Sequence, residues 1–404
     1  MSDLKYIIVI VTGLGDEPLE ALDGKTPLEV ATTPHLDRIS YEGRLGLVNT
    51  IDDHHRGGSE RALLSLFGYD TRGLGVTRGP LEAAGVGITL EPDDLALRMN
   101  FVSTFNGILV DHNAGQISDS ESIALVKMLN VRLGGETLSF HAGLGYRNLL
   151  VMKGCASLSF ETVPPHEILQ QPVRDFYPYG ADAQVLCDLL ERARAELEKN
   201  DINSVRIDLG ENPANTIWLW GQGRDFELPP FNTMFDLRGG LVGAAPLARG
   251  LARKIGLELI DVAGATGGLD TDYARKADGC LEALKRHDLV VVHVGAVNEA
   301  CHEGNPSSKI AAIEAVDSRL VGPLLEKLDG LDGWRMMIAT DHITSTLETT
   351  RARGPVPVAF CGQGVEGIRQ YAFTEANAAK SDLHVDNGHD LMEFFLGIPR
   401  KKRP

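Results

Sequence analysis

The stretch IVIVTGLGDEP, residues 8–18, decides the fold. The β-branched run from Ile7 to Val11 leads into a glycine-rich turn, which is the pattern of a fully buried strand that ends at a cleft. The residue at this strand end is Thr12, an uncharged hydroxyl. Similar apolar runs recur along the chain and alternate with helical segments. We therefore predict an α/β fold with a mostly parallel sheet that is covered by helices.

The alternation of strands and helices is strongest at the two ends of the chain. Near residue 236 it resumes with the strands of LELIDVAG, DLVVVHVG, WRMMIATDH and VPVAFCG, and with one helix predicted over 307–328. The block between the two ends is mixed in pattern. We predict one α/β domain, residues 1–103 plus 236–404, with a smaller α/β or α+β domain, residues 104–235, inserted into it. Residues 78–103 are expected to form a turn and two strands.

Composition limits the classes of partner and the compartment. The 404 residues carry a formal net charge of −17, which argues against nucleic acid or an anionic membrane as the partner. The five cysteines form no CxxC pair and are expected to be reduced thiols. The N-terminus lacks the features of a signal peptide, and no apolar run reaches the roughly 20 residues of a membrane span. A cytoplasmic protein is predicted.

Polar side chains follow three of the predicted strands at the point where each ends. They are Thr12, Asn298, His302, Asp341 and His342. Ser59 is predicted as the N-cap of the helix that runs from Glu60 to Leu66. Because ligands bind at the carboxyl ends of strands in open α/β sheets, we expect these groups to meet. Carboxylate and imidazole can hold a metal ion, and a hydroxyl at a helix N-terminus can act as a nucleophile. The pattern favours a metal-assisted phosphoryl-transfer site, although each residue singly is as well explained as a cap or loop residue.

Several longer motifs strengthen this interpretation. They are GKTPLEVATTPHLDRIS, GGSERALLSLFGYD, RGPLEAAGVGITL, VAGATGGLDTDYARKA, HVGAVNEACHEGNPSSKIAAIEAVD and ATDHITSTLETTRARGPVPV. On these stretches the chain resembles, over nearly its whole length, the cofactor-independent phosphoglycerate mutases of the archaeal type. It is most similar to a bacterial branch described as homoserine kinase-like. The resemblance implies the alkaline phosphatase superfamily fold, in which a mostly parallel sheet is sandwiched by helices. It also implies two divalent ions that activate a serine, which is Ser59 here.

Three positions depart from the metal ligands that the resemblance implies. Thr12 and Asn298 stand where the family has aspartate, and Arg351 stands where it has histidine. Because arginine cannot deprotonate to bind a metal and its charge repels a divalent ion, a two-metal site is not expected. At most a single weak site for Mn, Mg or Zn is predicted. Its candidate ligands are Asp341, His342 and His302, with Glu60 as a further candidate.

Basic residues within the family motifs are the candidate contacts for a small anionic metabolite. The predicted catalytic residues are Ser59, Lys276 and Arg351. The predicted substrate-binding residues are Arg78, Arg98, Arg147, His166 and Thr12. For each basic residue, a structural ion pair is the alternative explanation.

Three functions are compatible with this sequence. The main expectation is a divergent mutase homologue that acts on a small phosphorylated or carboxylated metabolite with altered chemistry. The first alternative is an authentic 2,3-bisphosphoglycerate-independent phosphoglycerate mutase that works through phospho-Ser59. The second is a non-catalytic binding or regulatory homologue. If the protein is an enzyme, it is expected to be an isomerase or a related phosphoryl-transfer enzyme, and the oligomeric state is not predicted.

Overall fold

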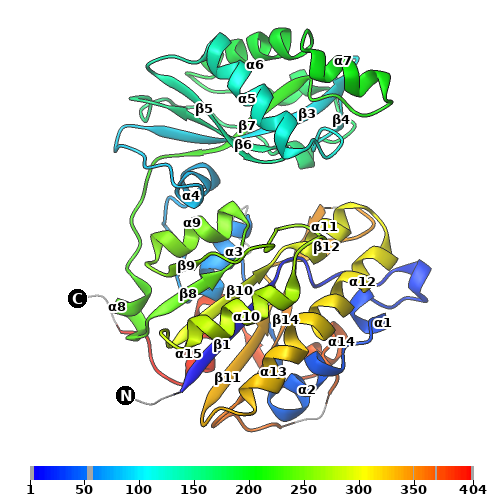
Figure 1. Cartoon of the computed structure of the whole chain (residues 1–404), viewed down its shortest axis with the longest axis vertical. Helices are drawn as coiled ribbons and strands as arrows, with labels where there is room; N and C mark the ends of the chain where they lie inside the picture. Colours follow the sequence, from blue (N-terminus) through cyan, green and yellow to red (C-terminus); the bar gives the residue numbers. More distant parts are fainter. Residues whose placement is uncertain (1–3, 52–57, 349, 369–370, 402–404) are drawn as a thin grey trace. The chain divides into compact units, whose positions relative to one another are not determined.

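The chain packs into two compact units, which Figure 1 shows in a computed structural model. The larger unit is Met1–Leu74 with Leu228–Pro404, and the smaller unit is Gly75–Glu227. The predicted division differs at both boundaries, since it assigned residues 75–103 to the larger domain and residues 228–235 to the inserted one. The structure describes residues 4–51, 58–348, 350–368 and 371–401.

The larger unit is built on one sheet, to which eight strands contribute among the described residues. Their order is β15 (Leu383–Val385), β2 (Arg44–Val48), β14 (Val356–Gly362), β11 (Trp334–Ala339), β1 (Lys5–Val11), β10 (Leu289–Val294), β8 (Gly239–Val242) and β9 (Glu258–Ile260). β14 runs antiparallel to β11 and β2, while the other pairings are parallel. A short antiparallel pair, β12 (Ile343–Ser345) and β13 (Thr350–Ala352), follows β11. The predicted mostly parallel sheet is confirmed.

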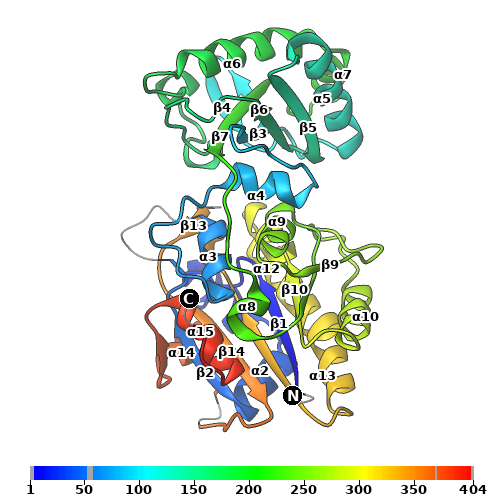
Figure 2. The ribbon, with the colours of Figure 1, turned by 90° about the vertical axis from the view of Figure 1, so that its left-hand side faces the viewer.

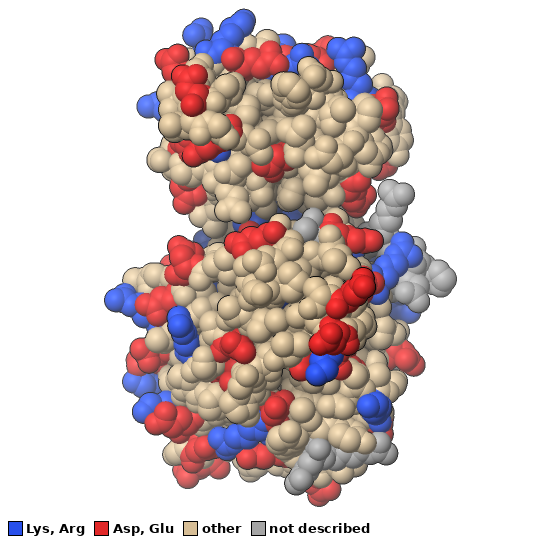
Figure 3. Space-filling model, turned by 90° about the vertical axis from the view of Figure 1, so that its right-hand side faces the viewer, with Lys and Arg blue, Asp and Glu red and all other residues tan. Residues whose placement is uncertain are grey.

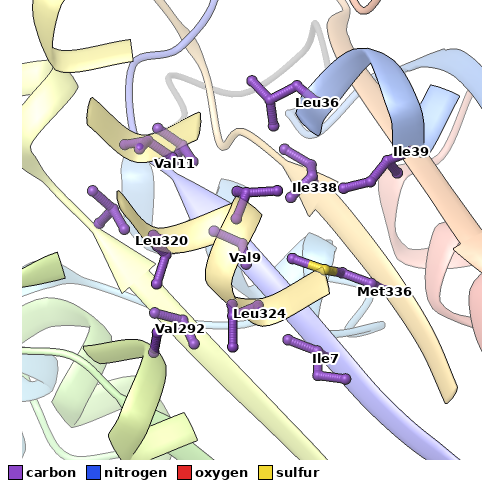
Figure 4. Packing of buried hydrophobic residues seen from close by; sticks show 14 of the residues in the cluster. Ile7, Val9, Val11, Leu36, Ile39, Val292, Leu320, Leu324, Met336 and Ile338 are labelled. Carbon is purple, nitrogen blue, oxygen red and sulfur yellow. The ribbon is translucent and has the colours of Figure 1, made fainter. Parts of the chain in front are cut away.

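Helices cover both faces of this sheet (Figure 2). In the described part of the chain they are α1 (Pro27–Val30), α2 (Pro34–Glu42), α3 (Ser59–Leu66), α8 (Phe231–Phe235), α9 (Pro246–Lys254), α10 (Tyr273–Leu284), α11 (Ala296–His302), α12 (Pro306–Val316), α13 (Gly322–Leu328), α14 (Glu375–Ala379) and α15 (Leu391–Leu396). Ile7 and Val9 of β1 pack on one face against Leu324 of α13 (Figure 4). On the other face the Tyr6 ring meets the Phe395 ring of α15 edge-on, with 5.7 Å between centroids. Burial on both faces explains why β1 is apolar at consecutive positions.

The single helix predicted over 307–328 is interrupted. A π-helical turn, Asp317–Val321, separates α12 from α13. Pro323 lies at the start of α13 and has no backbone N–H to continue the hydrogen-bond ladder, which explains the wider turn before it.

The smaller unit is an α+β domain. Its sheet has the order β4 (Ile108–Asp111), β3 (Leu95–Phe105), β6 (Arg147–Met152), β5 (Leu138–Leu144), and β7 (Thr216–Gly223) also pairs with β3. Its helices, in the part that the structure describes, are α4 (Arg78–Gly85), α5 (Asp119–Leu133), α6 (Gln184–Leu197) and α7 (Asp201–Asp208).

The expected turn and two strands over residues 78–103 are wrong, because this segment forms α4 and most of β3. Gly79 and Pro80 suggest a turn but lie in the first helical turn, where a missing N–H is harmless. A Cβ at Gly79 would lie 2.2 Å from the Ala96 carbonyl oxygen. The glycine therefore lets α4 pack directly on β3.

Candidate phosphoryl-transfer site

The ends of β1, β10 and β11 meet at one edge of the larger sheet. The register pairs Val11 with Val294 and Ile10 with Ala339. Thr12 therefore lies between the residues that follow the two neighbouring strands, and its N–H donates to the Val294 carbonyl at 2.9 Å. This adjacency is what the strand pattern predicts for an α/β sheet.

Ser59 lies beside His342 at this edge. α3 begins at Ser59 with Gly58 as its N-cap, so Ser59 is the first helical residue rather than the predicted cap. The Ser59 Oγ atom is 3.1 Å from the His342 Nε2 atom. His342 Nε2 is in turn 3.3 Å from an Asp341 carboxylate oxygen. All three side chains are buried, so a hydroxyl, an imidazole and a carboxylate lie close together away from the surface.

The Asp341 carboxylate is the least satisfied group of this cluster. It is completely buried, and among the described residues neither oxygen has a well-aligned hydrogen-bond donor. Burial raises the pKa of Asp341 to about 6, against the lowering effects of the Arg351 charge and of nearby backbone N–H groups. Arg351 lies on β13 and pairs in register with Thr344 of β12. The guanidinium predicted to take part in catalysis is thus near the carboxylate.

Asp341, His342 and Ser59 fit one of the divalent ions that the resemblance implies. A buried carboxylate, an imidazole nitrogen and a hydroxyl form a donor set that suits Mn, Mg or Zn. Three other described positions at this edge do not supply a charged oxygen or an imidazole for a second ion. Thr12 and Asn298 are neutral and bonded to His293 and Thr344, and Arg351 is a cation.

His302 is the third predicted metal ligand. It is partly buried on α11. Within the described residues, no three His, Cys, Asp or Glu side chains are grouped so as to hold a metal, and the site formed by Asp341, His342 and His302 stays a prediction. Glu60 follows Ser59 in α3 and is partly buried.

A second hydroxyl–imidazole pair lies at the same strand ends. Thr12 Oγ1 is 3.0 Å from Nε2 of His293. His293 is buried, and its burial, together with the charge of Lys276, lowers its pKa to about 3, which keeps the ring neutral. The sequence analysis did not select His293, although a polar residue inside VVVHVG is the signal that could have found it.

Lys276 is buried behind this pair. Its ammonium donates to the carbonyl oxygens of Thr266 and His293, each at 3.1 Å. Burial lowers the pKa of Lys276 to about 8. These bonds place its charge against the end of β10 rather than on the Ser59 hydroxyl.

The smaller unit holds a separate cluster of guanidinium groups. Arg78 donates to Glu82 at 2.7 Å, and Arg98 donates to the same carboxylate and, at 2.8 Å, to Asn100. Both guanidinium carbons lie within 6 Å of the Trp220 ring centroid, at 5.3 and 5.7 Å. Burial opposes ionisation of Glu82, but the charges of Arg98 and Arg78 outweigh it and hold its pKa below the ordinary value. Burial also lowers the pKa of Arg98, to about 10.

Two other predicted substrate residues belong to the same unit. Arg147 lies over the Tyr146 ring at 4.6 Å, and its charge lowers the pKa of Arg98. His166 meets the Trp220 ring edge-on, with 5.7 Å between the centroids. Three guanidinium groups, one buried carboxylate and the rings of Trp220 and Tyr146 therefore make up this cluster.

Charged side chains are distributed over the surface of the protein. On the face shown in Figure 3, acidic and basic side chains are interspersed among uncharged ones. In the part of the chain that is described, no helix is both long and apolar enough to cross a membrane.

Comparison with known proteins reveals similarity over the whole chain. Residues 41–203 match the family model of 2,3-bisphosphoglycerate-independent phosphoglycerate mutase. A protein of that name from Methanothrix thermoacetophila is 40% identical over 97% of this chain and 100% of its own length. A solved structure of a Pyrococcus horikoshii protein is 30% identical with a TM-score of 0.78, and the match covers 98% of this chain and 97% of that one. The cofactor-independent phosphoglycerate mutase from Thermoplasma acidophilum is 25% identical with a TM-score of 0.59, over 98% and 99% of the two chains.

Proposed function

Because the chain belongs to the family of 2,3-bisphosphoglycerate-independent phosphoglycerate mutases, we propose that it interconverts 2- and 3-phosphoglycerate through phospho-Ser59. From the sequence alone, altered chemistry is the main expectation. Relatives of that name, similar over the full length, support the mutase alternative better. The observation that carries the proposal is the buried Ser59 hydroxyl, 3.1 Å from His342 and placed at the start of α3.

In the proposed reaction Ser59 Oγ bonds to the phosphorus of the substrate as the phosphorus–oxygen bond of the substrate breaks. The serine proton ends on the freed substrate hydroxyl. In the second half the phosphoryl group passes from Ser59 to the neighbouring hydroxyl, whose proton returns to the serine. The N-terminus of α3 favours the negative charge of the phosphoryl oxygens, and His342 orients the Ser59 hydroxyl.

Asp341 and His342, with the Ser59 hydroxyl, would hold one divalent ion. When bound, such an ion supplies Lewis-acid polarisation of the serine and phosphoryl oxygens. Arg351 is proposed to supply a second positive charge by hydrogen bonding to the phosphoryl oxygens, as guanidinium groups do without any metal. Lys276 and Thr12 are proposed to position this edge of the sheet through His293.

In the smaller unit, considered by itself, the guanidinium cluster is proposed to bind a small anionic group. Arg78, Arg147 and His166 are the proposed direct contacts. Arg98 has only 3% of its side chain exposed and is bonded to Glu82 and Asn100, so we assign it the role of orienting its neighbours. Guanidinium groups bind phosphate and carboxylate groups through paired hydrogen bonds, which supports this assignment.

The test is a mutase assay with added Mn or Mg, combined with mass spectrometry of the Ser59 peptide. We expect turnover of 3-phosphoglycerate and a phosphorylated Ser59 peptide, both of which are lost in Ser59→Ala. Ser65→Ala removes another buried hydroxyl from the same helix and serves as the matched control. Absence of both turnover and phospho-Ser59 with either ion would overturn the proposal.

A second candidate function is phosphoryl transfer to a different small acid. Thr12, Asn298 and Arg351 favour it, because they remove negative charge from the site and add a cation. Phosphorylation of Ser59 by another phosphorylated metabolite, without turnover of phosphoglycerate, would support this function instead. The cytoplasmic location stays a prediction.

A further inference from the structure

His342 is held through both of its ring nitrogens. Nε2 faces Ser59 Oγ at 3.1 Å, and Nδ1 faces Thr344 Oγ1 at 3.0 Å. The Thr344 hydroxyl also lies 3.3 Å from the amide oxygen of Asn298, to which it donates. His342 and Thr344 are buried, and Asn298 is half-buried at the start of α11. A continuous chain of four side chains thus runs from α11 to α3.

One arrangement of protons satisfies the contacts of Asn298, Thr344 and His342 together. A threonine hydroxyl has a single proton, and it is directed to the Asn298 oxygen, which can only accept. Thr344 Oγ1 must then accept the proton of His342 Nδ1–H. In a neutral imidazole with Nδ1 protonated, Nε2 carries the lone pair. That lone pair faces the Ser59 hydroxyl and the Asp341 carboxylate.

The backbone around Thr344 is arranged to keep this geometry. The Thr344 N–H donates to the Gly15 carbonyl oxygen at 3.0 Å, which ties β12 to the turn after β1. Gly13 has φ +74°, and a Cβ there would lie 2.8 Å from Thr344 Oγ1 and 3.1 Å from Asn298. The glycine of the first turn therefore leaves the space in which Thr344 and Asn298 meet.

We propose that Thr344 and Asn298 are positioning residues that fix His342 in the tautomer whose Nε2 lone pair faces Ser59. This inference rests on the proposed function only in taking Ser59 as the nucleophile. An unprotonated Nε2 is what a metal ligand or an acceptor for the serine proton requires, and partners of this kind set the tautomer of functional histidines. An arrangement with a proton on Nε2, donated to Asp341 at 3.3 Å, is the alternative.

The test is long-range ¹H–¹⁵N NMR of protein labelled at histidine, in EDTA and at neutral pH. The His342 signals are assigned by their loss in His342→Gln. We expect a protonated Nδ1 and an unprotonated Nε2 in the wild type and in Thr344→Ser, which keeps the hydroxyl. Thr344→Val, and independently Asn298→Ala, should move the Nε2 signal toward the protonated form. With substrate, Thr344→Val should lower kcat about tenfold or more with little change in KM, and Thr344→Ser should restore it.

Two results would overturn the inference: a protonated Nε2 in the wild type, or identical His342 spectra in wild type, Thr344→Val and Asn298→Ala. The proposed function is tested by a separate result, the mutase activity of the wild type. If the wild type shows no mutase turnover but the spectra differ as expected, the positioning roles stand and the mutase assignment falls.

Discussion

Replacing Asp341 by asparagine is expected to stabilise the metal-free protein at neutral pH. Asp341 is completely buried and, among the described residues, has no well-aligned hydrogen-bond donor, and burial raises its pKa from 3.8 to about 6. Above pH 6 the folded protein must keep a charge in a place that disfavours it. Asparagine has the same shape without the charge.

The magnitude follows from the shift in pKa. A rise from 3.8 to about 6 is roughly two units, and each unit corresponds to about 1.4 kcal/mol, so the ionised carboxylate costs the folded state about 3 kcal/mol. Because the pKa of this carboxyl is raised in the folded protein, its protonated form is the one that stabilises the fold. The stability contributed by the protonated form is full below pH 3.8 and is lost as the pH rises through about 6. Asp341→Asn should therefore gain about 3 kcal/mol at pH 8 and almost nothing near pH 4.

The assay is urea unfolding in EDTA at both pH values, followed by hydrogen exchange of the β1 peptide, which reports the larger unit. Asp16→Asn is the matched control because Asp16 is also fully buried but pairs with Lys309 Nζ at 2.8 Å. Its replacement leaves a buried cation unpaired and should destabilise by about 3 kcal/mol or more. An Asp341→Asn protein that is no more stable than wild type at pH 8, or equally stabilised at pH 4, would refute the reasoning.

Three further perturbations have definite expected results. Gly13→Ala should destabilise the larger unit by about 2 kcal/mol or more in urea unfolding, because φ at this position is +74° and the new Cβ crowds Thr344. An unchanged urea concentration at the midpoint of unfolding would contradict this. Glu82→Gln should destabilise the smaller unit by about 3–5 kcal/mol near pH 7 by removing the buried negative charge that Arg78 and Arg98 share. Because the pKa of Glu82 is lowered, its contribution is full above the ordinary carboxyl pKa and disappears as the pH falls through the folded value, so a loss independent of pH would contradict the ion-pair explanation. Arg351→His should tighten Mn binding about tenfold or more in calorimetric titration, since a repelling cation becomes a ligand; equal affinity would show that Arg351 does not act on the metal position.

The local sequence pattern was sufficient to predict those elements whose residues favour a single type of secondary structure. β1, β10 and β11 are apolar at consecutive positions because both faces of the sheet are covered, and that pattern does not depend on distant contacts. α4 was missed because Gly79 and Pro80 suggest a turn, and only contact with β3 shows that the glycine serves close packing. The π-helical turn before Pro323 was also missed, because it can be predicted only when the helix is known to continue on both sides of it.

The sequence by itself determined the class of fold, the family and the identity of the groups that can take part in chemistry. Which groups meet was decided by the tertiary structure, because the order of strands in a sheet is not a local property. Placing β1 between β10 and β11 brings Thr12 to His293. The same edge brings Ser59 to His342 across 283 residues of chain. Thr12 is therefore bonded to an imidazole that the sequence analysis passed over, and the geometry places the proposed nucleophile one hydrogen bond away from a different imidazole, at the end of β11.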